Sequence, residues 1–351
     1  MSIVLITGSC GLVGAESSKF FCNKGFDVLG IDNNYRKIFF GNDGDTNWVK
    51  KNLIKKYKNY SHFNQNIQNY ASIKKIFQKY EKSIKLIIHS AAQPSHDLAK
   101  IIPILDFKNN AFSTINLLEL TKKYCPDSPF IFMSTNKVYG DNPNNLQLIE
   151  SATRWNLNKK NKFFNGIDES MSIDNCVHSL FGVSKTYADL AVQEYGKNIG
   201  LKTVCFRAGC ITGPMHSGAK LHGFLSYLVK SCLAKKKYTI IGYKGKQVRD
   251  NIHSSDLIQC FWNFFKKPRI GVIYNIGGGK KSNCSVLEAL SLTEKLGKIN
   301  IKKKYIKQHR VGDHIWYISN IEKFKKHYPN WKQKYSNFKI IEELVNNFSK
   351  N

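Results

Sequence analysis

The chain has 351 residues, of which 42% are hydrophobic and 13% aromatic, a composition that supports a large buried core and excludes a disordered chain. Lysine and arginine outnumber aspartate and glutamate 54 to 25, which gives a formal net charge of +29. The lysines are spread over helices and loops and form no basic arm. We therefore expect a solvated lysine surface that attracts an anionic substrate, and no nucleic-acid partner.

Nothing in the sequence indicates a membrane or a secreted protein. Apolar runs stay shorter than about 18 residues, and the amino-terminal strand passes directly into a glycine-rich loop without a basic leader. The nine cysteines form no CxxC pair. This spacing favours reduced thiols over disulfides or zinc, so we expect a cytoplasmic protein without a metal and without a membrane partner.

The first predicted strand, Ile3–Thr7, runs into the glycine loop TGSCGLVG, and a helix is predicted to follow over residues 15–25. Glycines between a strand and a helix permit a tight turn and a close approach to a pyrophosphate, while the helix N-terminus offers amides to its phosphates. The next strand, DVLGID, ends at Asp32. A carboxylate at this place holds a ribose 2′-hydroxyl and repels a 2′-phosphate, so the predicted cofactor is NAD and not NADP.

Strand and helix patterns then alternate, with strands predicted over 85–92 and 130–135 and a helix over 111–124. Such alternation predicts an α/β fold of the Rossmann type, a doubly wound parallel sheet with helices on both faces.

Beyond about residue 213 the pattern loosens. We expect residues 1–212 to form the NAD-binding domain, with an insertion at 141–177. Residues 213–351 should form mostly a smaller α/β substrate lobe, with some segments returning to the first domain.

The glycine loop, HSAAQ, STNKVYGD, GVSK and GKQVRDNIHSSD occur in an order that resembles the extended short-chain dehydrogenases, over nearly the whole chain. Within them the resemblance is to the NAD-dependent nucleotide-sugar epimerases and dehydratases. The stretches IDNNYRKIFFG, IDES, HSLFGVSK and VQEYG look most like the CDP-paratose 2-epimerases. The resemblance implies a CDP-linked deoxyhexose as substrate and a homodimer or homotetramer as the assembly.

In such enzymes a tyrosine takes the proton of a sugar hydroxyl while the carbon passes a hydride to NAD. The resemblance assigns the Ser/Thr position to Thr135 and the lysine position to Lys185, but the tyrosine position holds Phe181, which has no hydroxyl. Two substitute bases stay open, His96 in HSAAQPSH and Cys210 in RAGCITGP.

Other answers to the missing hydroxyl also stay open. Tyr139 is a third candidate, and bound water or the loss of catalysis are the remaining ones. The chain is thus predicted to be either a working epimerase with a relocated base or a catalytically silent NAD- or nucleotide-sugar-binding protein.

The resemblance also implies substrate contacts. Arg249 and Arg310 match arginines that grip the nucleotide diphosphate through a planar fork. Asn136 and Lys137 follow Thr135 where the 4,6-dehydratases carry an acid. An amide cannot protonate a departing oxygen as a carboxylic acid does, so the sequence favours epimerisation over water elimination.

The residues expected to contact NAD lie in the glycine loop, after the next three strands and on two helices. They are Gly8, Cys10, Gly11, Leu12, Val13, Gly14, Asp32, Asn33, Asn66, Ile67, Ala91, Ala92, Gln93, Asn110 and Lys185. For Asn110 a purely structural hydrogen bond is an equally open reading.

Overall fold

The structure is a computed structural model that describes residues 2–216, 223–309 and 312–349. It divides into two compact units. The first unit contains residues 1–138, 180–207 and 258–274, and the second contains residues 139–179, 208–257 and 275–351. Among the residues described, no helix is long and apolar enough to cross a membrane.

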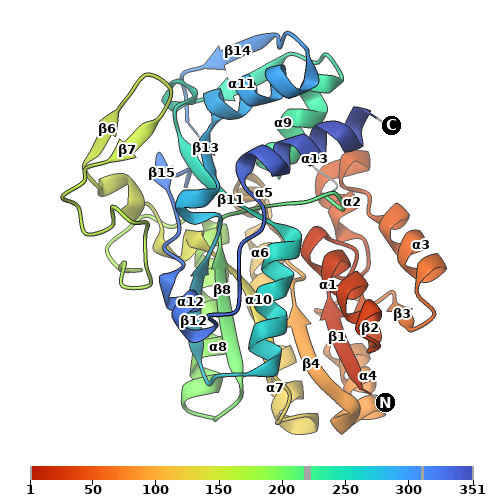
Figure 1. Cartoon of the computed structure of the whole chain (residues 1–351). Helices are drawn as coiled ribbons and strands as arrows, with labels where there is room; N and C mark the ends of the chain where they lie inside the picture. The colour runs from red at the N-terminus through yellow and green to blue at the C-terminus, as the bar shows by residue number, and fades with distance from the viewer. Residues whose placement is uncertain (1, 217–222, 310–311, 350–351) are drawn as a thin grey trace. The chain divides into compact units, whose positions relative to one another are not determined.

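A seven-stranded sheet forms the centre of the first unit (Figure 1), in the order β12-β8-β5-β4-β1-β2-β3. Its strands are β1 (Ile3–Thr7), β2 (Asp27–Ile31), β3 (Tyr60–Phe63), β4 (Ile84–His89), β5 (Phe130–Thr135), β8 (Thr203–Ala208) and β12 (Val272–Ile276). Strand β1 pairs in parallel with β2 on one side and with β4 on the other. The strand order therefore reverses between β1 and β4, and ligands of open α/β sheets bind at the carboxyl ends of strands beside such a switch point.

Helices cover both faces of this sheet. They are α1 (Leu12–Asn23), α2 (Tyr35–Phe40), α3 (Asn47–Lys56), α4 (Tyr70–Tyr80), α5 (His96–Ile101), α6 (Pro103–Phe107), α7 (Ser113–Tyr124), α8 (Leu180–Lys197) and α10 (Ser254–Lys266). On one face, buried apolar residues of α4, α7 and α8 form a continuous core with alternate residues of the strands. On the other face, Phe21 of α1 packs against Trp262 of α10, and Phe261 of α10 packs against Phe206 of β8.

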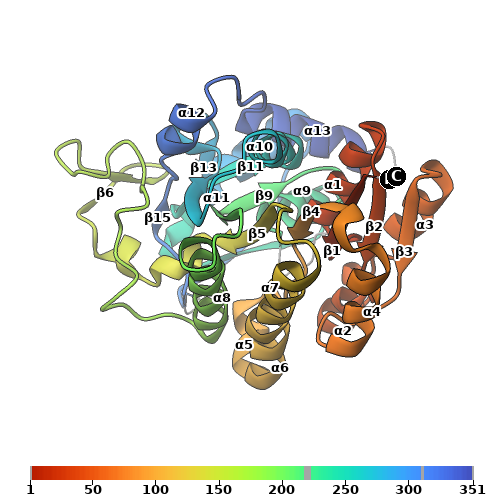
Figure 2. The ribbon, with the colours of Figure 1, turned by 90° about the horizontal axis from the view of Figure 1, so that it is seen from below.

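Figure 2 shows α5, α6, α7 and α8 as neighbours in the first unit. A π-helical segment, η3 (Lys108–Phe112), joins α6 to α7. The helix predicted over 111–124 therefore begins as regular α-helix at Ser113, because an extra residue is inserted into the preceding turn.

The second unit has its own core, made by α9 (Phe224–Leu233), α11 (Val286–Gly297) and α13 (Asn337–Ser349). Its other elements are β6 (Leu148–Glu150), β7 (Trp155–Leu157), β9 (Cys210–Thr212), β10 (Tyr238–Ile241), β11 (Val248–His253), β13 (Asn283–Ser285), β14 (Lys303–Ile306), β15 (Trp316–Tyr317) and α12 (Glu322–His327). Strand β11 is central, because it pairs with β9, β13 and β15.

The predicted fold class is confirmed: a parallel central sheet with helices on both faces. The strands predicted over 3–7 and 130–135 have the bounds expected from their apolar runs. The assignment of cofactor to residues 1–212 and of substrate to the remainder stays a prediction.

Candidate active site

The loop between β1 and α1 is a tight glycine turn that lies against the end of β4. Gly8 has φ +68°, and a Cβ placed on it would lie 2.8 Å from the backbone nitrogen of Ala91. A Cβ on Gly14 would lie 2.1 Å from the carbonyl oxygen of Gly8. Because α1 begins after Gly11 with no side-chain cap, the amides of its first turn have no competing side-chain acceptor at the cap. Such a helix start fits a pyrophosphate.

Asp32 follows β2 and is oriented by two backbone amides. Its Oδ2 accepts a hydrogen bond from the amide of Cys10 at 2.9 Å, and its Oδ1 accepts one from the amide of Asn34 at 2.8 Å. The carboxylate therefore sits beside the glycine loop, where an adenosine ribose bound to that loop would meet it. Burial, then the charge of Asp32, raises the pKa of the Cys10 thiol to about 12, so Cys10 stays protonated.

The other residues predicted around the cofactor also belong to the first unit. Leu12, Val13, Asn33, Ala91 and Ala92 are partly exposed, whereas Ile67 and Gln93 are buried. Asn66 donates from Nδ2 to the hydroxyl of Tyr35 at 3.1 Å and accepts from the amide of Gln68 at 2.9 Å. This set of glycine backbone, helix start and carboxylate fits NAD, which supplies a hydride acceptor when bound.

Lys185 lies on the inner side of α8 and is only 4% exposed. Its ammonium donates to the carbonyl oxygen of Met133 at 2.7 Å and lies 4.1 Å from the centroid of the Phe132 ring. Burial lowers the pKa of Lys185 to about 8, against an opposing effect of Asp189, Cys205 and Asp106. The amine can therefore change its charge near neutral pH, which an exposed lysine cannot do.

The Thr135-Asn136-Lys137 turn is placed by the carboxyl end of β5. Thr135 is the last residue of β5, and the 3₁₀ turn η4 (Asn136–Tyr139) follows it. The Thr135 hydroxyl accepts from the amide of Lys137 at 3.2 Å and donates to Oδ1 of Asn136 at 3.4 Å. The hydroxyl thus has a fixed place at the edge of the sheet where the switch point lies.

Phe181 is in the first turn of α8, four residues before Lys185, and is 7% exposed. The structure places the imidazole of His96, the first residue of α5, against it. The two ring centroids are 4.8 Å apart at an interplanar angle of 62°. Of the two substitute bases weighed from the sequence, His96 is therefore the one that shares a ring contact with the residue in the tyrosine position.

The remaining candidates belong to the second unit. Cys210 begins β9 and is half-buried. Arg249 on β11 donates to the carbonyl of Val248 at 3.0 Å and forms an ion pair with Asp313 at 3.4 Å. Tyr139 is fully buried, and its hydroxyl donates to Oδ1 of Asn275 at 2.7 Å, which explains it as a packing residue. Arg310 lies outside the described residues.

Sequence reasoning missed several polar groups in the core beneath the site. His89 bridges the hydroxyls of Thr7 and Thr114 at 2.7 and 2.9 Å, and burial lowers its pKa to about 3. Asp189 is fully buried and pairs with Arg207 through both carboxylate oxygens. The available signal was the presence of polar residues such as Asp189 among the apolar residues of α8, because buried polar groups need buried partners.

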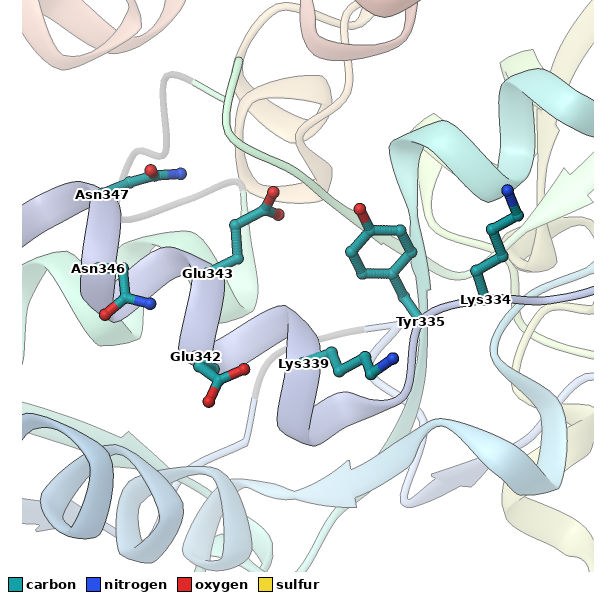
Figure 3. Close-up of a pocket in the computed structure, with 7 residues that line it drawn as sticks. All are labelled: Lys334, Tyr335, Lys339, Glu342, Glu343, Asn346 and Asn347. Carbon is teal, nitrogen blue, oxygen red and sulfur yellow. The ribbon is translucent and has the colours of Figure 1, made fainter.

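The second unit has a cavity of about 520 Å³ beside α13 (Figure 3), lined by Lys334, Tyr335, Lys339, Glu342, Glu343, Asn346 and Asn347. His253 contacts two of these lining residues: its ring stacks on Tyr335 with centroids 3.8 Å apart, and its Nε2 lies 2.8 Å from a carboxylate oxygen of Glu343. The residues predicted for catalysis do not line this cavity. Within the described ranges no group of three His, Cys, Asp or Glu side chains is arranged to hold a metal ion.

The sequence of this chain is similar to those of known nucleotide-sugar epimerases. The chain is 30% identical to the CDP-paratose 2-epimerase of Salmonella typhi, over 91% of each chain. It is 25% identical to the UDP-glucuronate 4-epimerase of Thermodesulfobacterium geofontis, over 99% of this chain and 96% of the other.

Two solved structures share the fold. The UDP-glucose 4-epimerase of Thermotoga maritima, solved with UDP-glucose, has a TM-score of 0.80 at 22% identity over 99% of both chains. The UDP-glucuronic acid 4-epimerase of Bacillus cereus, solved with UDP-glucuronic acid and NAD, has a TM-score of 0.79 at 24% identity over 99% of both chains. The model of the NAD dependent epimerase/dehydratase family matches residues 4–277. The chain therefore belongs to the NAD dependent epimerase/dehydratase family, and its cofactor is NAD.

Proposed function

We propose that this protein is a nucleotide-sugar epimerase that acts on a CDP-linked deoxyhexose in the manner of a CDP-paratose 2-epimerase. The curated relative with that name supports the substrate, because the similarity covers 91% of each chain. The turn after β5 supports the reaction type. Buried Asn136 stands where an eliminating enzyme needs an acid, and an amide has no acidic proton to give.

In the proposed reaction His96 would take the proton of the sugar hydroxyl, and NAD, when bound, would supply the acceptor for the hydride of the same carbon. The Thr135 hydroxyl holds the reacting oxygen, and the ammonium of Lys185 sets the local positive charge. The keto-sugar would then present its opposite face for return of the hydride, and His96 would give its proton back to the reacting oxygen. No net oxidation occurs, and each atom removed is restored.

One observation carries the assignment of the base: the His96 ring lies edge-on to Phe181 with centroids 4.8 Å apart. Histidine is the side chain whose ordinary pKa suits proton transfer near neutral pH. Cys210 lies in the second unit, and it remains the alternative if His96 proves dispensable.

The substrate contacts of Asn136, Lys137, Arg249 and Arg310 belong to the same proposal. Arg249 offers a planar guanidinium whose bond to Asp313 is long, at 3.4 Å, so a diphosphate can compete for it. The nine cysteines are all free thiols, in keeping with a reducing compartment, and we place the protein in the cytoplasm.

We also propose that the protein forms a homodimer through the α5–α8 face of the first unit. This face carries large apolar side chains between 45% and 74% exposed, namely Ile101, Ile104, Phe107, Phe112, Leu180, Val183, Tyr187 and Leu190. Exposed apolar side chains gathered on neighbouring helices are typical of an interface, and a two-fold axis lets one face bury itself against its copy.

The experiment is an NMR assay of the protein with NAD and a panel of CDP-, UDP- and dTDP-linked sugars. The assay is run in heavy water. We expect interconversion of CDP-paratose and CDP-tyvelose with no loss of water and with no solvent deuterium at the epimerised carbon. Turnover of a UDP-linked sugar without turnover of any CDP-linked sugar would contradict the proposed CDP-linked substrate. Deuterium at that carbon would exclude a hydride that stays on NAD.

A further inference from the structure

A buried carboxylate in the first unit connects the two elements that bring His96 and Phe181 together. Asp106 is only 1% exposed. Its Oδ1 accepts hydrogen bonds from Nε2 of Gln93 at 2.7 Å and from Nδ2 of Asn110 at 3.1 Å, and its Oδ2 accepts one from the hydroxyl of Ser184 at 2.5 Å. A carboxylate taken out of water is costly unless it is bonded in this way. Burial raises the pKa of Asp106, whereas Ser184, Gln93 and Lys185 lower it.

One arm of this network leads from Asp106 to His96. The Gln93 side chain donates to the carbonyl of Ser95 at 2.8 Å and accepts from its amide at 2.6 Å. The Ser95 hydroxyl caps α5 by accepting from the amide of Leu98 at 3.3 Å. His96 is the first residue of α5, so the start of the helix that carries the imidazole is fixed by a side chain that Asp106 holds.

The second arm leads from Asp106 to α8. Ser184 precedes Lys185, and its hydroxyl also lies 3.1 Å from the carbonyl of Phe181. The first turn of α8, with the residue in the tyrosine position, is therefore tied to the same carboxylate. A displacement of either arm would change the distance between the imidazole of His96 and the ring of Phe181.

The π-helical segment η3 supplies the third element. A π turn is rare and is mostly found at functional sites. Here the segment carries Asn110, whose side-chain amide makes two hydrogen bonds with the backbone of Gln93. The Asn110 side chain accepts from the Gln93 N–H at 2.8 Å and donates to the Gln93 carbonyl at 3.0 Å. The same Nδ2 also faces Asp106 and Ser184. The segment after β4 and the first turn of α8 are thus joined through a side chain that a regular helix would place elsewhere.

We infer that Asp106 is a positioning residue for the proposed reaction: its carboxylate sets the place of the His96 imidazole against Phe181 through Gln93 and Ser184. The inference rests on the proposed role of His96. Asp106 is 1% exposed, and it acts through its hydrogen bonds to Gln93, Asn110 and Ser184.

The test compares Asp106→Ala, which breaks both arms, with Asp106→Asn, which keeps one acceptor oxygen for Gln93 and Asn110. Asp256→Ala is the matched control, because Asp256 is an equally buried carboxylate that accepts from the amides of Lys334 and Tyr335 in the second unit. We expect Asp106→Ala to lower kcat at least tenfold with KM changed less than threefold, on the order of the loss seen when a catalytic group is misplaced. Asp106→Asn should recover most of that loss, and Asp256→Ala should leave kcat unchanged.

A second readout does not depend on turnover. The ring signals of His96 are assigned by their loss in His96→Ala and followed by NMR in the NAD-loaded protein. They should shift in Asp106→Ala and keep their positions in Asp256→Ala. If Asp106→Ala does not fold, Gln93→Met, which cuts the arm to Ser95, should give the same shift.

The inference is overturned if the His96 signals are unchanged in every Asp106 and Gln93 variant. It is also overturned if the losses of Asp106→Ala and His96→Ala multiply in the double variant, because residues that act through one group are not additive. A protein that turns over no sugar but shows the NMR shift would contradict the proposed function and leave the positioning intact.

Discussion

The imidazole of His96 and the phenyl ring of Phe181 lie edge to face, with centroids 4.8 Å apart. The resemblance to extended short-chain dehydrogenases assigns to Phe181, four residues before Lys185, the position of their catalytic tyrosine. The group beside Phe181 is an imidazole, the kind of side chain that most often serves as a general acid or base in enzymes. Under the proposed function, His96 takes over the proton that the phenyl ring of Phe181 cannot carry.

The position of Asp32 predicts a cofactor preference. Its carboxylate is held by the amides of Cys10 and Asn34 beside the glycine loop, where it would repel a 2′-phosphate. Calorimetry should show NAD binding at least tenfold more tightly than NADP. Asp32→Ser should reduce this difference, since it removes the repelling charge. Equal affinities in the wild-type protein would contradict the assignment.

Lys185 predicts a pH dependence of stability. Its folded pKa is about 8, below the ordinary 10.5, because burial disfavours its charge. Between these two values the unfolded chain binds the extra proton, so this group makes the free energy of unfolding rise with pH, by up to about 3 kcal/mol. Urea unfolding at pH 7.5, 9 and 10.5 should show the rise in the wild type and a smaller one in Lys185→Met. Parallel pH curves for the two proteins would refute this.

The fully buried pair of Asp189 and Arg207 predicts a large loss of stability on removal of one partner. Asp189→Asn leaves the Arg207 guanidinium, which is 4% exposed on its side chain, without a full counter-charge. Its free energy of unfolding should fall by about 3–5 kcal/mol. Glu322→Gln, which breaks an exposed pair with Lys325, is the control and should cost less than about 1 kcal/mol. Similar losses in both variants would mean that the buried pair contributes no more than a surface one.

The α5–α8 face predicts a dimer that a single charge weakens. Leu190 is 46% exposed on this face, whereas Ile270 is 58% exposed elsewhere in the first unit. Sedimentation at micromolar concentration should find the wild type and Ile270→Glu dimeric, and Leu190→Glu mainly monomeric, since a buried unpaired charge is costly. A monomeric wild type would exclude the proposed interface.

Much of the fold follows from local patterns that needed no tertiary information. The apolar runs at Ile3–Thr7 and Phe130–Thr135 gave strands with the expected bounds, because a central parallel strand is apolar on both faces. The glycine loop likewise identified the β1–α1 turn. The resemblance, and not spacing, assigned roles to Lys185 and Phe181; their spacing of four residues predicts only that they share a helix face, as they do on α8.

Other parts of the site depend on contacts between distant segments. Nothing in the order of the chain predicts that Asp106 bonds Ser184, 78 residues away, or that His96 meets Phe181. The π segment arises from one inserted residue, which the helical periodicity of the sequence does not reveal. For the same reason the sequence alone leaves His96 and Cys210 as equal candidates, because it does not tell which side chain lies against the ring of Phe181.

The central claim, that chemistry persists with His96 in place of the missing tyrosine, is tested most directly by kcat on CDP-paratose and CDP-tyvelose in wild type, His96→Ala, Phe181→Tyr and the double variant. Removing one positioned base typically costs 10²–10⁴-fold, so His96→Ala should lose about that factor relative to wild type. Phe181→Tyr in the His96→Ala background should recover much of it, because a hydroxyl then returns to the first turn of α8. A wild-type protein that is inert on every nucleotide sugar, with a Phe181→Tyr variant that turns over, would contradict the claim and identify a silent NAD-binding protein.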